Sequence, residues 1–178
     1  MDKINKTSGV LKEKGIFSTR TLRVAILGVV IITLFSIAWN VGSWASTPES
    51  DFKFDELTGT IIRYKGEDSN VEIPSEIEGV PVTTIGEGAF QGCSLTSITI
   101  PDSVTTIGDF AFRGCTSLTS ITIPDSVTTI GEDVFSNCDN LTSITLPDSV
   151  TTIGDNVFWE CTSLTSIKIP DSVTTIGY

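Results

Sequence analysis

The residues with the greatest chemical potential in this sequence are its cysteines, which recur at a nearly fixed interval. Metal and redox sites of the Cys-x-x-Cys kind need two thiols close together in the chain, because both must reach one ion or one disulfide. Successive cysteines here are 22, 23 and 23 residues apart, so the spacing excludes such paired sites. The set consists of Cys93, Cys115, Cys138 and Cys161.

A second regular set is acidic, because an aspartate follows the proline in four Ile-Pro or Leu-Pro pairs. A row of carboxylates can bind calcium, whose preferred ligands are oxygens, but no Asp-x-Asp-x-Asp-Gly loop is present. Aspartate is also a common turn and capping residue, which is the simpler interpretation. The set consists of Asp102, Asp125, Asp148 and Asp171.

Catalytic chemistry has little support in the composition. The sequence contains no histidine, which excludes acid–base, nucleophilic and metal chemistry that depends on imidazole. It has no glycine-rich phosphate-binding loop, and no pair of carboxylates is set apart by an unusual sequence context. We therefore predict that the chain is not an enzyme and that it needs no cofactor and no metal ion.

Internal repetition explains why these residues are evenly spaced. The segment SITIPDSVTTIG occurs unchanged at 97–108 and 120–131, and the prolines of the Ile/Leu-Pro pairs are 27, 23, 23 and 23 residues apart. Ile98–Ile100 alternates apolar and polar residues, which predicts a short strand that ends where proline lacks an N–H to donate. A second extended run and a glycine follow. The spacing in Asp109–Cys115 predicts about one helical turn.

A single repeat of this kind cannot bury its own apolar side, whereas stacked repeats can. The predicted fold is therefore a β-rich repeat solenoid with short helical turns, in which equivalent residues form columns about 4.8 Å apart. The cysteine column then has two interpretations: small buried core thiols, or at least one disulfide such as Cys138 to Cys161 in an oxidising compartment. The aromatic column of the predicted core is Phe90, Phe112, Phe135 and Phe158.

Charge and hydropathy divide the chain before the repeats begin. Residues 1–23 carry a net charge of +4, residues 24–45 carry none, and residues 46–178 carry −15. The uncharged stretch is long enough to cross a bilayer as a single transmembrane helix, although it also suits a cleaved signal peptide. Because basic flanks stay on the cytoplasmic side, we expect residues 1–23 to be a cytoplasmic tail and the acidic part to face outward.

The repeated motif resembles that of a known family. The pattern Leu-x-x-Ile-x-Ile-Pro-x-x-Val-x-x-Ile-Gly-x-x-Ala-Phe-x-x-Cys is similar to the BspA-type (Treponema-type) leucine-rich repeat of 23 residues. We assign residues 71–178 to about five such coils, the last incomplete, residues 52–70 to an N-terminal capping hairpin and residues 46–51 to a linker. The resemblance implies a leucine-rich-repeat scaffold that binds proteins or glycans at a cell surface, for example in adhesion.

Candidate binding residues are those that change from one repeat to the next, because the stacked core must stay constant while solvent-facing turns can differ. Exposed tryptophan and arginine are favoured at binding hot spots. Trp159 is either such a contact or a shield for the end of a short array. The candidate partner-binding residues are Phe110, Arg113, Asn137, Trp159 and Glu160.

The expected partner is an extracellular protein or glycan, and the N-terminal helix is expected to bind the membrane. Nucleic acid is excluded as a partner, because the net charge of −15 on residues 46–178 repels phosphates. The predicted location is the cell membrane, single-pass with the repeats outside, or the extracellular medium if the N-terminal segment is cleaved. A rival hypothesis is a structural surface protein that self-associates into a homo-oligomer through the open end of the solenoid.

Overall fold

A computed structural model describes residues 46–178. The predictions for the basic tail, residues 1–23, and for the transmembrane or signal segment, residues 24–45, lie outside the described residues. Within residues 46–178, no helix has both the length and the apolar character needed to cross a membrane.

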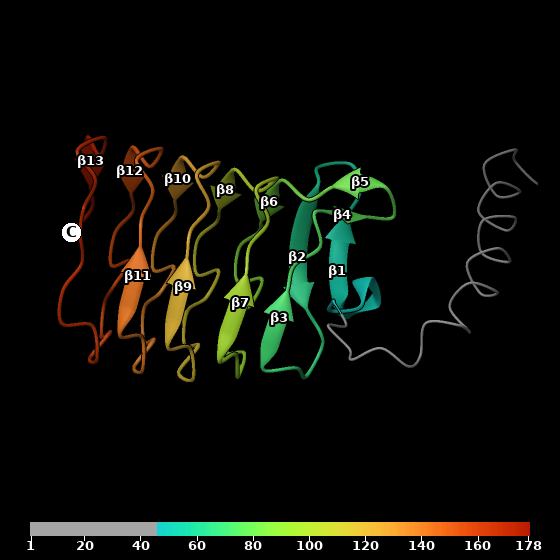
Figure 1. The fold of residues 1–178 in the computed structure, drawn as a ribbon, viewed down its shortest axis with the longest axis horizontal. Coiled ribbons are helices and arrows are strands. Elements are labelled where there is room, and N and C mark those ends of the chain that lie inside the picture. The colour runs from blue at the N-terminus through green and yellow to red at the C-terminus, as the bar shows by residue number, and fades with distance from the viewer. Residues whose placement is uncertain (1–45) are drawn as a thin grey trace, which may run out of the picture. The chain divides into compact units, whose positions relative to one another are not determined.

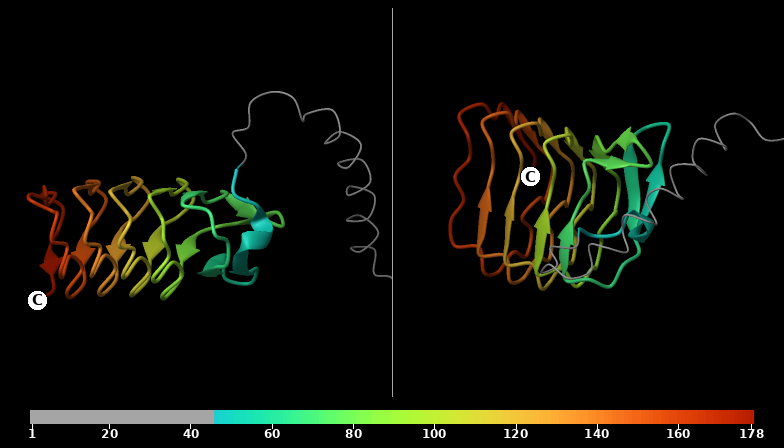
Figure 2. Two further views of the ribbon diagram at one scale, coloured as in Figure 1. Left: turned by 90° about the horizontal axis from the view of Figure 1, so that it is seen from below. Right: turned by 45° about the vertical axis from the view of Figure 1, so that its right-hand side comes forward.

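The unit is a β-solenoid of about five coils, stacked in sequence order along one axis (Figures 1 and 2). Its spine is a sheet of seven strands in which β2 pairs in parallel with β6, and each later strand pairs in parallel with the next. The strands in spatial order are β1 (Phe52–Asp55), β2 (Thr60–Tyr64), β6 (Thr84–Ile85), β8 (Thr106–Ile107), β10 (Thr129–Ile130), β12 (Thr152–Ile153) and β13 (Thr175–Ile176).

A glycine after each Thr-Ile strand lets neighbouring coils approach closely. The N–H of Gly131 donates to the Ile107 carbonyl oxygen at 3.0 Å, and the N–H of Gly154 donates to that of Ile130 at 3.0 Å. A Cβ atom on Gly154 would lie 2.5 Å from the Gly131 carbonyl oxygen, well inside van der Waals contact. The glycine of the repeat is therefore required by the spacing of the coils.

The Ser-Ile-Thr strands form a second face that is hydrogen-bonded only in pairs. Strand β3 (Asn70–Glu72) pairs with β7 (Ser97–Thr99), and β9 (Ser120–Thr122) pairs with β11 (Ser143–Thr145), but no pairing joins β7 to β9 among the described residues. Each of β7, β9 and β11 buries its central isoleucine and exposes the hydroxyl residues on either side, as the alternation predicts. Proline follows this face in every coil and removes one possible N–H donor.

The predicted helical turns are wrong, because the segment Asp109–Cys115 forms consecutive tight turns and no helix. The N–H groups of Arg113 and Cys115 donate to carbonyl oxygens three residues earlier, at 3.0 and 3.1 Å. The alternate N–H groups, those of Phe112 and Gly114, donate instead to the next coil at 3.0 and 2.8 Å. A helix needs its N–H groups for hydrogen bonds within its own segment. Because alternate N–H groups here donate to the neighbouring coil, no helix forms. The only helix described is a short 3-10 turn, η1 (Glu49–Asp51).

The phenylalanines of successive coils stack in the core as the sequence predicts. Ring centroids of Phe90 and Phe112 are 5.3 Å apart, those of Phe112 and Phe135 are 5.6 Å apart, and those of Phe135 and Phe158 are 5.9 Å apart. The first three rings have no exposed surface, and Phe158 is partly buried against the same core. Offset stacking at these distances adds about 0.5–1.5 kcal/mol per pair beyond the burial of area.

The N-terminal hairpin continues the aromatic column beyond the repeats. Strand β1 runs antiparallel to β2, and the loop between them closes at Gly59, whose N–H donates to the Asp55 carbonyl oxygen at 2.9 Å. Tyr64 stacks on Phe90 with centroids 5.5 Å apart, and Phe52 lies 5.4 Å from Tyr64. The hairpin therefore covers the apolar end of the first coil with aromatic side chains of its own.

Two short segments near this hairpin are more ordered than a linker or a loop. In the segment expected as a linker, Thr47 is buried and its hydroxyl oxygen accepts the N–H of Glu72 at 2.9 Å. The five-residue insertion before the second repeat forms a two-strand hairpin of β4 (Glu76–Ile77) and β5 (Val80–Pro81). Its turn residues, Glu78 and Gly79, both have positive φ, as a tight type I′ turn requires.

Removing one ring from the phenylalanine column should unfold the solenoid at lower denaturant concentration. Phe135→Ala should lower the free energy of unfolding by about 3–5 kcal/mol, because it leaves a cavity between two stacked rings. Phe135→Leu should cost clearly less, because it fills most of that space. Urea titration of both variants, followed by circular dichroism, measures the difference. A loss below about 1 kcal/mol for Phe135→Ala would mean that the ring is not packed as described.

Candidate functional site

The candidate partner-binding residues lie in the turns that connect the spine sheet to the second face, in three consecutive coils. Phe110 and Arg113 are in one coil, Asn137 in the next, and Trp159 and Glu160 in the third. Backbone hydrogen bonds tie these turns together: the N–H of Gly114 donates to the Ser136 carbonyl oxygen and that of Asn137 donates to the Trp159 carbonyl oxygen, both at 2.8 Å. The residues therefore form a row parallel to the solenoid axis.

Exposure along this row increases toward the last coil. Trp159 is 60% exposed. Glu160 is exposed, whereas Phe110, Arg113 and Asn137 are half-buried. The Arg113 guanidinium carbon lies 5.5 Å from the centroid of the Phe110 ring, a cation–π distance that holds both side chains against the turn. Trp159 and Glu160 are the members of the row most accessible to a partner.

The turns impose a backbone conformation that the sequence did not reveal. Phe110 has φ 58°, Asn137 has φ 60° and Glu160 has φ 55°, all in the left-handed region. Glycine occupies equivalent positions in other coils, at Gly88, Gly92 and Gly114, with φ between 58° and 70°. Side chains other than glycine, asparagine and aspartate pay about 1–2 kcal/mol for this conformation. Phe110 and Glu160 are therefore strained residues at variable positions, which is a common property of functional sites.

The cysteine column lies directly after these turns and is part of the core. All four cysteines are free; Cys115, Cys138 and Cys161 are buried, and Cys93 is half-buried. The Cys115 thiol donates to the Phe90 carbonyl oxygen at 3.1 Å, and the Cys138 thiol donates to that of Phe112 at 3.3 Å. Each thiol thus binds the coil before its own. The described structure therefore corresponds to the interpretation as core thiols.

Burial makes these thiols poor nucleophiles. Loss of hydration raises the pKa of the Cys138 thiol to about 12, with a smaller contribution from the neighbouring Cys161. The same desolvation raises the pKa of Cys115 still further, and raises those of Cys93 and Cys161. Only the thiolate attacks electrophiles or binds metals readily, so the column has a structural role.

The aspartates that follow the prolines face solvent in tight turns. Asp102, Asp125, Asp148 and Asp171 are exposed. Two residues after each of the first three aspartates, the N–H of a valine donates to the carbonyl oxygen of the proline in the same turn, at 3.0–3.1 Å. Within residues 46–178, no three acidic or cysteine side chains gather closely enough to hold a metal ion. The geometry is that of turn residues.

The surface has two hollows that were not predicted from the sequence. One, of about 380 Å³, lies where β7 and β9 are not paired and is lined by hydroxyl residues of both strands. The other, of about 350 Å³, lies on the outer side of the N-terminal hairpin and is lined by Phe52, Phe54 and several charged residues. Neither belongs to the row of variable turns. No periodic signal marks the second, because it lies outside the repeats.

Glu160→Gly should stabilise the protein, because glycine adopts positive φ without strain. The expected gain in the free energy of unfolding is about 1 kcal/mol, reduced slightly by the greater freedom of glycine in the unfolded chain. Thermal unfolding of the two proteins measures it. The matched control is Glu132→Gly, which removes an exposed glutamate whose φ is not positive and should destabilise. If both substitutions destabilise equally, the strain at Glu160 is absent.

The buried thiols should make the protein less stable in alkali. Because their pKa values are raised in the folded state, the unfolded chain loses these protons first as the pH rises above about 8.5. The contribution of the thiols to the free energy of unfolding should therefore be fully present below that pH. Above it, the free energy of unfolding should fall by about 1.4 kcal/mol per thiol for each pH unit, up to the pKa of the folded state. Urea titrations with reductant, from pH 8 to 11, should show a steeper fall for the wild type than for Cys115→Ala/Cys138→Ala. An equal fall with pH for the two proteins would contradict the conclusion that burial raises the pKa of these thiols.

Comparison with known proteins gives consistent matches to one repeat class. The family model described as BspA type leucine rich repeat region matches residues 82–178 in six copies. A leucine-rich repeat protein from Treponema pallidum is 38% identical, with a TM-score of 0.71, and the match covers 75% of this chain and 64% of that chain. One from Bacteroides ovatus is 36% identical, with a TM-score of 0.61, and the match covers 78% of this chain and 37% of that chain.

A more distant structure is the pneumococcal vaccine antigen PcpA, 26% identical with a TM-score of 0.52, where the match covers 75% of this chain and 31% of that chain. The chain thus spans less than two thirds of the length of each of these relatives. A comparison with curated protein sequences gives no match. The family match, the repeated period and the stacked coils agree, and this chain belongs to the BspA-type leucine-rich repeat family.

Proposed function

We propose that this protein is a non-enzymatic binding protein that recognises a protein or glycan partner at the cell surface through its row of variable turns. The observation that carries the proposal is the contrast between the core and the turns. The core columns repeat almost without change, whereas the turn residues vary among the coils and include strained Phe110 and Glu160 and exposed Trp159. A scaffold that only fills space has no need for such differences.

The row suits recognition more than catalysis. Its members are aromatic, cationic, amide and acidic side chains on a rigid edge, where hydrogen bonds between coils fix their spacing. A backbone that is already fixed loses little entropy on binding, which favours affinity. Leucine-rich repeats are typically scaffolds of this kind, and the T. pallidum and B. ovatus relatives carry the same repeat.

The proposal places the repeats outside the cell. Residues 24–45 are uncharged and follow a basic segment, so they are expected to act as a membrane anchor or as a signal peptide, with the acidic repeats translocated. The name of the related PcpA, a vaccine antigen, supports a surface location for this class. Adhesion to another cell or to matrix is the form of binding that such a location favours.

The proposed function predicts that capture of a partner depends on Trp159. The full chain, immobilised and exposed to host and bacterial surface extracts, should retain at least one specific protein or glycoconjugate. Trp159→Ala should reduce that capture by about tenfold or more, the usual effect of truncating a hot-spot side chain. The matched control is Leu57→Ala, because Leu57 is 96% exposed but lies in the hairpin loop. Equal capture by the wild type and both variants would contradict binding of the partner through the variable turns.

A further inference from the structure

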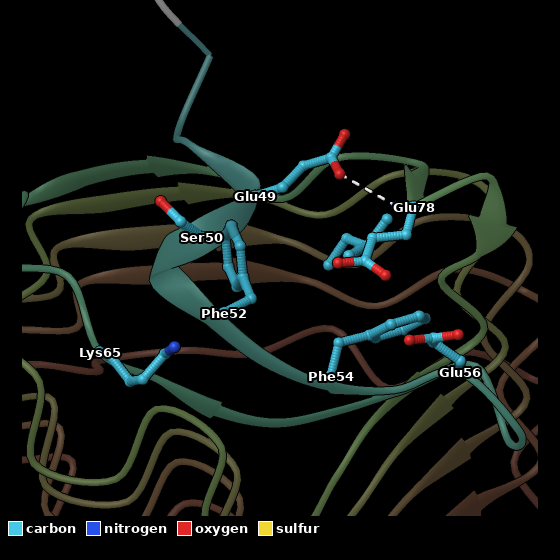
Figure 3. A pocket seen from close by; sticks show the side chains of 8 residues that line it. Glu49, Ser50, Phe52, Phe54, Glu56, Lys65 and Glu78 are labelled. Carbon is cyan, nitrogen blue, oxygen red and sulfur yellow. Dashed lines mark hydrogen bonds between the residues drawn. The ribbon is translucent and has the colours of Figure 1, made fainter. Parts of the chain in front are cut away.

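The hollow on the outer side of the N-terminal hairpin has an apolar floor. Phe52 and Ile77 are buried and form its base, and Phe54 is half-buried beside them. Figure 3 shows the rings of Phe52 and Phe54 facing the hollow from strand β1. The volume of about 350 Å³ is enough for one long side chain and its neighbours, at the lower end of the range for ligand sites.

The rim of this hollow is acidic. Glu49, Glu56 and Glu78 stand around it, all exposed, and the only cation among the lining residues is Lys65. Figure 3 shows Glu56 and Glu78 on one side of the Phe54 ring and Lys65 on the opposite side. The lining therefore carries a net charge of −2, and its negative part is concentrated over the aromatic floor.

One of the three carboxylates, that of Glu49, is positioned by a hydrogen bond from the backbone. The N–H of Glu78 donates to Glu49 Oε2 at 3.0 Å, which links the 3-10 turn η1 to the β4–β5 hairpin. Glu78 itself is held at φ 53° in the tight turn of that hairpin. The insertion that interrupts the first repeat thus supplies one wall of the hollow, and the segment before the hairpin supplies another.

We propose that this hollow is a second binding site, specific for a lysine- or arginine-bearing peptide segment of a partner protein. The aliphatic stem of the partner side chain would lie on Phe52, Phe54 and Ile77, and its cationic head would lie among the carboxylates of Glu56 and Glu78. Aromatic faces attract cations, and a neighbouring carboxylate strengthens the attraction. The net charge of −15 on residues 46–178 adds long-range attraction for a basic partner.

Other occupants fit the chemistry less well. Phosphates of nucleic acid and anionic lipid headgroups are repelled by the acidic rim, and the group of three glutamates lacks the close convergence that a metal ion needs among the described residues. The site is also independent of the variable turns, because it lies on β1, η1 and the β4–β5 hairpin, before the coils that contain Phe110 to Glu160. Failure of one proposal therefore leaves the other untouched.

The test is the affinity of the full chain for a labelled hexa-arginine peptide, measured by fluorescence anisotropy at physiological salt. Glu56→Gln/Glu78→Gln should weaken binding by about fivefold or more, since it removes two exposed charge contacts with the cationic head. Phe54→Leu should weaken it by about two- to fivefold, because it keeps an apolar floor but removes the aromatic face. A hexa-glutamate peptide should not bind. Thermal unfolding of each variant verifies that the fold is intact.

The matched control is Glu87→Gln/Glu132→Gln, which removes the same two charges from exposed positions outside the hollow. It should change the affinity by less than about twofold, because only diffuse attraction is lost at this ionic strength. Equal weakening by the two double variants would overturn the proposal, since binding would then follow net charge alone. Absence of saturable binding to the wild type would overturn it as well.

Discussion

Backbone hydrogen bonds that run along the solenoid axis are the constraint on which the rest of this structure depends. On the spine sheet, the N–H of the glycine in each coil donates to the isoleucine carbonyl oxygen of the coil before it, at 2.8–3.0 Å. In the turns, alternate N–H groups donate to the coil that follows, also at 2.8–3.0 Å. These bonds are directional, so every coil must lie in register with its neighbours. Registered coils bring like side chains together, which explains the stacked phenylalanines and the thiols that donate to the preceding coil.

The same constraint limits what the variable turns can contain. Because alternate N–H groups in a turn are used between coils, two positions in each turn adopt positive φ. Glycine, asparagine and aspartate tolerate that conformation, and they occupy most of these positions, as at Gly114, Asp133 and Asn137. Phe110 and Glu160 occupy positions where positive φ favours glycine, asparagine or aspartate. Trp159 lies at a position whose φ is not positive, so its residue type is not restricted in this way. The residue types available for recognition are thus set by the coil spacing as much as by the partner.

Much of the fold could be predicted because one period carries most of the information. Proline and phenylalanine spacing predicted the number of coils and the columns of the core, and the alternation of apolar and polar residues predicted which side of the Ser-Ile-Thr strands is exposed. The N-terminal hairpin was expected only from the resemblance to the family. The helical turns were predicted wrongly because apolar spacing in Asp109–Cys115 fits one turn of helix equally well when the neighbouring coil is ignored. The role of Tyr64 in extending the aromatic column was missed, since a single tyrosine outside the repeats has no periodic counterpart. The candidate residues were found by their variation, but their strain depends on φ, which variation does not reveal.

The position of the second site follows from where the axial constraint ends. Inside the array, every coil has a neighbour on both sides, and the hollow found there lies where β7 and β9 are not paired. Among the described residues, strand β1 pairs with one strand only, so its other side is free of the register that the repeats impose. Aromatic side chains that close the first coil, such as Phe52, can therefore also form the floor of a surface hollow, and non-repeating segments on either side of β1 can supply its charged rim. A capped solenoid end can thus supply an aromatic floor and a charged rim that do not have to follow the period of the repeats.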